Sequence, residues 1–222
     1  MKVVVRILHS GTIDPLLTRW MMWAAKKYHL WDIEPFFSAE GVVAARNYMV
    51  SDFLQGDGDR LWLIDSAITP PRSNAIVKHD FPVLCGVYGI HLGQPGALPS
   101  LYKMNNAYWD TLPVNQWPEH KVFKVDGAGL GCVVIEREVL ESMEPPWFHY
   151  GSSDYPHDNV DMAFSRKVGG VHVVRDCTCQ HVQSIDVSPE VERTMMANLG
   201  AYAVQNDLLK EQGPVDPPEV AG

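Results

Sequence analysis

Hydrophobic residues in the first 90 positions follow two alternating patterns. Short apolar runs of the kind that form buried strands occur at residues 3–8, 33–37, 61–64 and 83–88. Between them, helical patterns occur at residues 15–27, 41–54 and 73–78. Asp14 can cap the first helix, because Pro15 follows it at the favoured first helical position. This alternation predicts an α/β fold with a parallel sheet and helices on its faces.

The second half of the chain is less regular. Residues 91–117 have no clear period, and we expect a long excursion or a small antiparallel hairpin there. The remaining patterns predict strands at 122–125, 132–135 and 171–174, and helices at 137–143, 160–168 and 189–210. The sequence therefore predicts one domain over 1–184 and a C-terminal helix within 185–212 that packs on it or forms a homodimer contact. The proline-containing tail at 213–222 is expected to be disordered.

Charge and hydropathy narrow the classes of partner. The 222 residues carry a formal net charge of -9, from 18 basic and 27 acidic side chains. No cluster of Lys and Arg stands out, which disfavours duplex nucleic acid as a partner. No apolar stretch approaches the ~18 residues that a membrane span needs. The short run at residues 3–5 is flanked by charges and predicts a strand instead of a signal peptide, so we expect a cytoplasmic protein.

Two features suggest a ligand site. Asp65 directly follows the apolar run 61–64, which places it at the carboxyl edge of a sheet, where α/β folds bind ligands. A carboxylate there can meet a metal or a ribose hydroxyl, or it can simply be solvated. Gly127, Gly129 and Gly131 form a glycine-rich segment that permits close backbone approach or a tight turn. The segment matches neither the dinucleotide fingerprint nor a P-loop.

Two aspartates stand three residues apart at a predicted helix start. Asp158 and Asp161 are placed where the helix dipole stabilises a carboxylate. Such a carboxylate beside an acceptor hydroxyl can act as a general base. The alternative for Asp158 is that it only caps the helix.

The four cysteines are Cys85, Cys132, Cys177 and Cys179. We expect reduced thiols, which often pack as small hydrophobic residues. Cys177, Cys179 and His181 alternate, so an extended strand would put them on one face. That arrangement admits a zinc site, but a fourth ligand is not evident.

The order of these features resembles the GT-A glycosyltransferases, in particular small family-2-like enzymes of bacteria and bacteriophages. The resemblance covers residues 3–181. Ala45-Arg46-Asn47 is similar to the family's "aRN" element, and the strand ending at Asp65 is similar to its Asp-x-Asp strand, with prolines soon after. The segment from Gly127 to Phe148 is similar to the acceptor-side loop, strand and helix, and the helix of Asp161 to the "EDxxF…G" helix.

The resemblance implies a GT-A fold, with a mostly parallel central sheet flanked by helices, and the transfer of a sugar from a nucleoside-diphosphate sugar to a hydroxyl. A UDP-sugar is implied by family frequency alone, and the acceptor is not indicated. Asp161 would be the base of an inverting reaction. The other implied roles are donor binding by Arg46, Asp65, Ser66 and Gly129, Mn²⁺ or Mg²⁺ binding by Asp65 and His181, and the acceptor side for Trp147 and Asp158.

The sequence departs from the family's pattern at two positions. Ala67 stands where the second Asp of Asp-x-Asp is expected, and Val160 stands where a Glu precedes Asp161. A metal-independent reaction would then need a cationic side chain, such as Arg46 or Arg72, facing the phosphates. A non-catalytic nucleotide- or sugar-binding protein is a further alternative. A nucleotidylyltransferase is disfavoured, because the loop at residues 9–12 lacks the Arg or Lys that would hold a triphosphate.

Overall fold

A seven-stranded sheet forms the centre of the computed structural model, which describes residues 1–90, 98–105 and 108–182. The order is β10-β13-β5-β12-β3-β1-β2. The strands are β1 (Val3–His9), β2 (Trp31–Phe37), β3 (Arg60–Asp65), β5 (Val83–Val87), β10 (Val122–Val125), β12 (Cys132–Glu136) and β13 (Val171–Thr178). Because β12 is antiparallel to both β3 and β5, and β10 is antiparallel to β13, the other five strands share one direction. The predicted mostly parallel sheet is confirmed.

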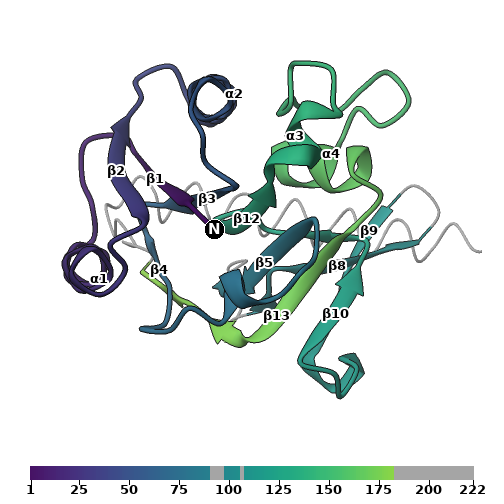
Figure 1. Cartoon of the computed structure of the whole chain (residues 1–222). Coiled ribbons are helices and arrows are strands. Elements are labelled where there is room, and N and C mark those ends of the chain that lie inside the picture. The colour runs from purple at the N-terminus through teal and green to yellow at the C-terminus, as the bar shows by residue number, and fades with distance from the viewer. Residues whose placement is uncertain (91–97, 106–107, 183–222) are drawn as a thin grey trace, which may run out of the picture. The chain divides into compact units, whose positions relative to one another are not determined.

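Helices cover both faces of this sheet (Figure 1). The helices are α1 (Pro15–Lys27), α2 (Val42–Gln55), α3 (Arg137–Glu141) and α4 (Val160–Lys167). Alternate residues of β3 point to opposite faces, so Leu61 and Leu63 pack with α2, α3 and α4, whereas Trp62 and Ile64 pack with α1. The sheet is therefore buried on both sides, as its continuous apolar runs require.

Three small sheets border the main one. A three-stranded sheet combines β8 (Leu101–Asn105), β9 (Tyr108–Thr111) and β11 (Gly127–Ala128). The other two pair β4 (Ile68–Thr69) with β14 (Gln180–His181), and β6 (Gly89–Ile90) with β7 (Leu98–Pro99). Because β4 follows β3 at once, its pairing with β14 brings His181 near the end of the strand that carries Asp65.

Several sequence-based boundaries need correction. The helix expected at 73–78 is only a 3-10 turn, Ile76–Lys78, because the segment is short and follows two prolines. The helix expected at 137–143 ends at Glu141, and a second 3-10 turn lies at Val114–Gln116. The hairpin alternative within 91–117 is confirmed for its described residues, and Gly127–Ala128 adds a strand to it.

Two further expectations concern the last predicted strand and the C-terminal segment. The strand expected at 171–174 continues to Thr178 through a register shift against β5. The expected helix at 189–210 and the tail at 213–222 lie outside the described residues.

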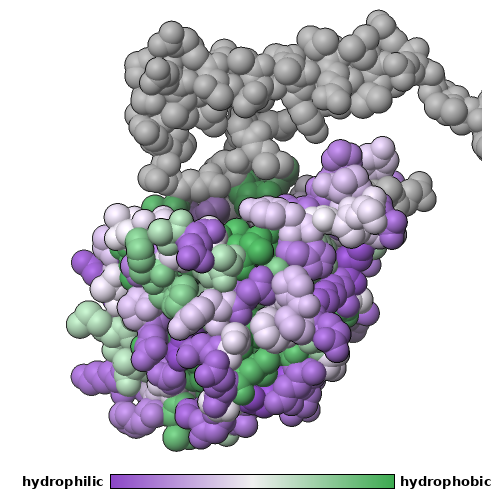
Figure 2. Space-filling view, turned by 90° about the horizontal axis from the view of Figure 1, so that it is seen from above, coloured by the Kyte–Doolittle hydropathy of each residue, from purple (hydrophilic) through white to green (hydrophobic). Residues whose placement is uncertain are grey.

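The surface of the described domain is mixed. On the face in Figure 2, hydrophilic residues are interspersed with smaller apolar areas. The large exposed apolar side chains are spread over several elements, with Met22 in α1 and Tyr108 in β9, for example. Within the described residues, no helix has the length and apolar character needed to cross a membrane.

Candidate functional site

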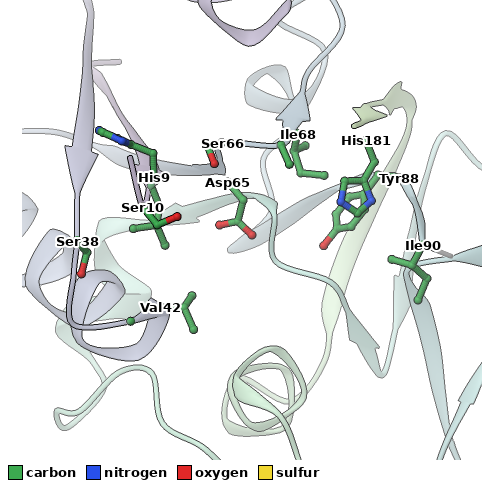
Figure 3. A pocket seen from close by; sticks show the side chains of 13 residues that line it. His9, Ser10, Ser38, Val42, Asp65, Ser66, Ile68, Tyr88, Ile90 and His181 are labelled. Atoms are coloured by element: carbon green, nitrogen blue, oxygen red, sulfur yellow. The ribbon is translucent and has the colours of Figure 1, made fainter. Parts of the chain in front are cut away.

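A cavity of about 430 Å³ lies at the carboxyl edge of the parallel strands (Figure 3). Its walls come from the ends of β1 and β3 and the residues after them, from the segment between β2 and α2 with the first residue of α2, from Tyr88, and from β4, β6 and β14. The lining residues are Leu8, His9, Ser10, Ser38, Gly41, Val42, Asp65, Ser66, Ala67, Ile68, Tyr88, Ile90 and His181. Asp65 thus lies where its position after an apolar strand predicts.

Arg46 of α2 joins two carboxylates beside this cavity. Its Nη1 donates to Asp161 Oδ1 at 2.6 Å, and its Nη2 lies 3.3 Å from both carboxylate oxygens of Asp65. The Arg46 side chain is only 2% exposed, whereas Asp65 is 38% and Asp161 is 25% exposed. Arg46 therefore holds the two carboxylates from their buried side, and each carboxylate stays partly exposed to solvent.

The charges of this group are unequal. Burial lowers the pKa of Arg46, but Asp65 and Asp161 raise it by more, so the guanidinium stays charged. Burial raises the pKa of Asp65, and nearby Asp161 adds to that rise, while Arg46 opposes it. One cation between two carboxylates leaves a net negative charge when both are ionised. Such a site attracts a cation.

Asp161 is fixed by the start of α4 and by the glycine segment. The helix is capped by Asn159, whose Oδ1 accepts from Met162 N at 2.9 Å, so Asp161 falls in the first turn. Asp161 Oδ2 accepts from Leu130 N at 3.1 Å. The possibility that Asp158 is the cap is therefore wrong. Asp161 instead has one oxygen on Arg46 and the other on the backbone.

Gly129 and Gly131 allow the glycine segment to lie close to Tyr88 and Asp65. A Cβ atom on Gly129 would lie 2.2 Å from the Tyr88 hydroxyl, and one on Gly131 would lie 3.2 Å from Asp65 Oδ2. The Tyr88 hydroxyl accepts from Gly131 N at 3.1 Å. Tyr88 is a site residue that sequence reasoning did not assign to the site, although it is the last residue of the predicted strand 83–88.

His181 has one ring nitrogen, Nε2, that makes no hydrogen bond to any other described residue. Its Nδ1 lies 2.7 Å from Gly89 O, and because a carbonyl only accepts, Nδ1 carries the proton. Nε2 is then an acceptor that can bind a metal, and its orientation is fixed in the way metal-binding histidines usually are. The ring also contacts Tyr88, with centroids 5.4 Å apart. Among the described residues, no group of three His, Cys, Asp or Glu ligands includes Asp65 or His181.

Asp158 and Trp147 are held by internal bonds. Asp158 is 4% exposed, and it accepts from Trp109 Nε1 at 2.7 Å and from Arg166 Nε at 2.9 Å. Burial raises the pKa of Asp158, but the hydrogen bonds from Arg166 and Trp109 outweigh this effect and lower it overall. Trp147 Nε1 donates to Leu140 O at 2.9 Å. Neither side chain presents a free polar group to an acceptor.

Comparison with known proteins identifies the fold. No family model and no curated protein matches the sequence. The structure is similar to "A197 from STIV", with 20% identity, coverage of 83% of this chain and 87% of that chain, and a TM-score of 0.62. It is also similar to "GalNAc-T7 with UDP, GalNAc and Mn2+", with 13% identity and a TM-score of 0.56 over 83% of this chain. The chain matches only 44% of the length of GalNAc-T7. At these identities the likeness is one of fold, and this chain has the α/β fold of the GT-A glycosyltransferases.

Proposed function

We propose that this protein transfers a sugar from a nucleoside-diphosphate sugar to an acceptor hydroxyl. The observation that carries the proposal is the Arg46-bridged pair of Asp65 and Asp161 beside an open cavity at the carboxyl edge of the sheet. A volume of about 430 Å³ is in the range of small-molecule sites. The matching GT-A fold supports this assignment at the level of architecture.

The donor would occupy the cavity with its ribose near Asp65 and Ser66. Ser10 and Ser38 supply further hydroxyls at the ends of β1 and β2. Gly129, which the family resemblance assigned to donor binding, is buried against Tyr88 and does not line the cavity, so it has no direct contact with the donor in this proposal. Arg46 contributes indirectly in this proposal, because its guanidinium is occupied by Asp65 and Asp161.

The diphosphate needs a cation that the cavity walls do not supply. Among the described lining residues there is no Lys or Arg. Arg46 is buried in ion pairs, and Arg72 lines a different cavity with Trp20 and Pro71. Asp65 and His181 Nε2, which both line the cavity, would hold an ion such as Mn²⁺ or Mg²⁺. Such an ion takes further ligands from phosphate and water, so Ala67 does not exclude it. The metal would act as a Lewis acid on the leaving diphosphate.

Asp161 is the proposed general base. Its bonds to Arg46 and Leu130 N fix its orientation, and a quarter of the side chain stays exposed. The proton of the acceptor hydroxyl moves to Asp161 as the acceptor oxygen bonds to the anomeric carbon. The bond from that carbon to the diphosphate oxygen breaks in the same step, and the diphosphate takes its electron pair. A single displacement of this kind inverts the anomeric centre.

The first test is thermal unfolding with UDP, GDP, dTDP and CMP, each with and without Mn²⁺. A ligand at 100 times its Kd stabilises by ~2.7 kcal/mol, which is about 5–10 °C for a domain of this size. We expect one nucleotide to raise Tm, and to raise it more with Mn²⁺. A metal-independent rise would remove the metal role of Asp65 and His181, and no rise with any nucleotide would overturn the donor site.

The second test separates catalysis from binding alone. NMR of the products formed from the stabilising nucleotide's sugar donors, with a panel of hydroxyl acceptors and with water, should show the inverted anomer. A retained anomer would remove the base role of Asp161. Nucleotide binding without turnover of any donor would favour the alternative of a non-catalytic binding protein, which Ala67 supports.

A further inference from the structure

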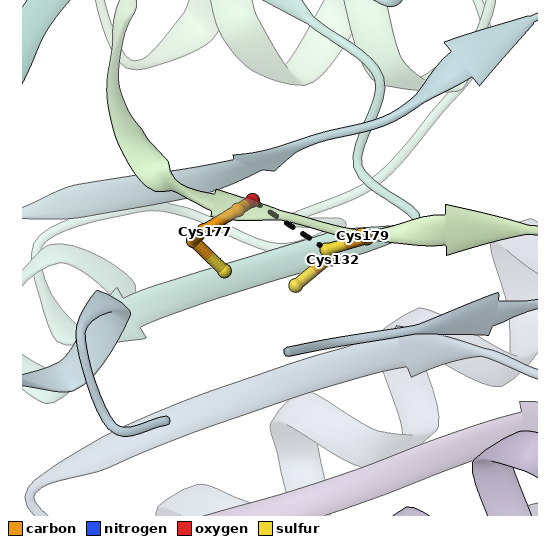
Figure 4. A group of neighbouring side chains, drawn as sticks. All are labelled: Cys132, Cys177 and Cys179. Carbon is orange, nitrogen blue, oxygen red and sulfur yellow. Dashed lines mark hydrogen bonds between the residues drawn. The ribbon is translucent and has the colours of Figure 1, made fainter. Parts of the chain in front are cut away.

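Three cysteines meet in the core on the side of the sheet covered by α1. They are Cys132 of β12, Cys177 of β13 and Cys179 just after β13 (Figure 4). Their Sγ atoms all lie within 4.8 Å of one another, and all three residues are buried. Sequence spacing alone suggested Cys177 and Cys179 with His181. The group in the described structure contains Cys132 and not His181.

The fold makes room for these sulfur atoms. The pairing of β13 with β5 shifts register between Val173 and Thr178, and Cys177 lies in that irregular stretch. Gly86 of β5 lies against the group, where a Cβ atom would be 2.9 Å from Cys179 Sγ and 3.0 Å from Cys132 Sγ. Any side chain at position 86 would thus displace the sulfur atoms. The fourth cysteine, Cys85, packs in the core on the opposite face of the sheet.

The spacing suits a metal ion. A metal–sulfur bond of about 2.3 Å places the sulfur atoms of a trigonal site about 4.0 Å apart. Separations within 4.8 Å therefore need only small side-chain adjustments. Trp62 Nε1 lies 3.4 Å from Cys132 Sγ and donates to it, which offsets part of the negative charge of a thiolate. No carboxylate or imidazole joins the group among the described residues.

We propose that Cys132, Cys177 and Cys179 bind one thiophilic metal ion, with Cu⁺ preferred to Zn²⁺. Thiolates select soft ions of this kind. Structural zinc almost always has four ligands, whereas Cu⁺ accepts three sulfur ligands in a water-free setting. On binding, the S–H bonds break, metal–sulfur bonds form and the protons pass to solvent, with no change of oxidation state. This site is separate from the proposed donor site.

The test measures metal uptake by the full-length reduced protein. Cu⁺ under anaerobic conditions and Zn²⁺ in a parallel series compete with chromophoric chelators. Because the site is buried, each metal is added both to folded protein and during refolding from denaturant. We expect one equivalent of Cu⁺ per chain, weaker retention of Zn²⁺, and an X-ray absorption spectrum with only sulfur in the first shell.

Matched variants locate the site. Cys132→Ser and Cys179→Ser should each weaken Cu⁺ retention at least tenfold. Cys85→Ser is the control, because it makes the same substitution at a buried cysteine outside the group. Circular dichroism checks that each variant folds, and the sulfur-only shell of the wild type tests the proposal if one does not. No stoichiometric uptake, oxygen or nitrogen in the first shell, or equal retention in C85S and C132S would overturn it and leave three packed thiols.

Discussion

Two arginine–carboxylate groups each include a residue of α4, Asp161 in its first turn and Arg166 in its last turn. The two groups differ in which charge is buried. In the first, Arg46 is 2% exposed and its partners Asp65 and Asp161 are 38% and 25% exposed. In the second, Asp158 is 4% exposed and its partner Arg166 is 18% exposed. The buried member is the cation in one group and the carboxylate in the other. Only the first group can present a carboxylate to a ligand.

The second group acts as a brace between the β8–β9 hairpin and α4. Arg166 lies over the rings of Trp109, at 5.0 Å, and Tyr155, at 3.5 Å, while it holds Asp158. Trp109 of β9 donates to the same carboxylate. Both charges of this group are therefore satisfied by neighbouring residues of the fold. We expect substitutions in the first group to change catalysis, and substitutions in the second group to change the stability of the fold.

Asp161→Asn should give the largest effect. The amide keeps the shape of the side chain but cannot take a proton, so we expect transfer to fall by about 10²–10⁴-fold. The Tm rise caused by the nucleotide should remain. The measurement is single-turnover transfer together with thermal unfolding, and Asp154→Asn is a control at an exposed aspartate. Full activity in D161N would show that another group is the base.

Asp158→Asn should reduce stability by about 2 kcal/mol, measured by urea unfolding at pH 7, because it weakens a buried charged hydrogen-bond pair. Its pKa is lowered in the folded state, so this stability is present above the unfolded value near 4 and lost as pH falls through the folded value. D158N should therefore flatten the acid limb of the stability curve. An unchanged acid limb would contradict the brace.

Asp65→Asn should leave Tm at pH 7 unchanged or slightly higher. The folded pKa of Asp65 is raised, so the stability it contributes is present below the unfolded value and lost as pH rises through the folded value. At pH 7, removing this charge also removes the free-energy cost of keeping the Asp65 carboxylate ionised in the folded protein. The same variant should lose the Mn²⁺-dependent part of the nucleotide effect. A Tm loss of several degrees would contradict this assignment.

Tyr155→Leu should give the smallest effect. It removes one aromatic face from Arg166 and should cost about 0.5–1 kcal/mol in urea unfolding. Transfer rates should not change, because Tyr155 belongs to the brace. A rate loss without a stability loss would instead place Tyr155 on the acceptor side.

The sequence predicted the parts of the molecule that depend on local pattern. The apolar runs of β1, β3 and β5 and the position of Asp65 at a strand end were read correctly. The insertion of β12 between β3 and β5 was not predictable, because pairing between distant strands leaves no local signal. The meeting of Cys132 with Cys177 depends in the same way on strand order and on a register shift.

Arg46 shows the same limit within the site. The family resemblance implied that Arg46 binds the donor, whereas the structure bonds its guanidinium to Asp65 and Asp161. Its burial between these two carboxylates depends on the tertiary fold. Asp161 was expected at a helix start, and it lies there. Its bond to Leu130 N could not be anticipated, since it requires the glycine segment to pass beside α4.

The contacts of Arg46 also bear on how the protein reaches its working state. Arg46 meets Asp65, 19 residues away, and Asp161, 115 residues away. The second contact closes a long loop, and such contacts are slow to form because the chain entropy is lost first. During synthesis, a chain that does not yet include residue 161 cannot form the contact between Arg46 and Asp161. Recovery of activity after dilution from denaturant should therefore coincide with the last tertiary folding phase, and not with the earlier formation of helices.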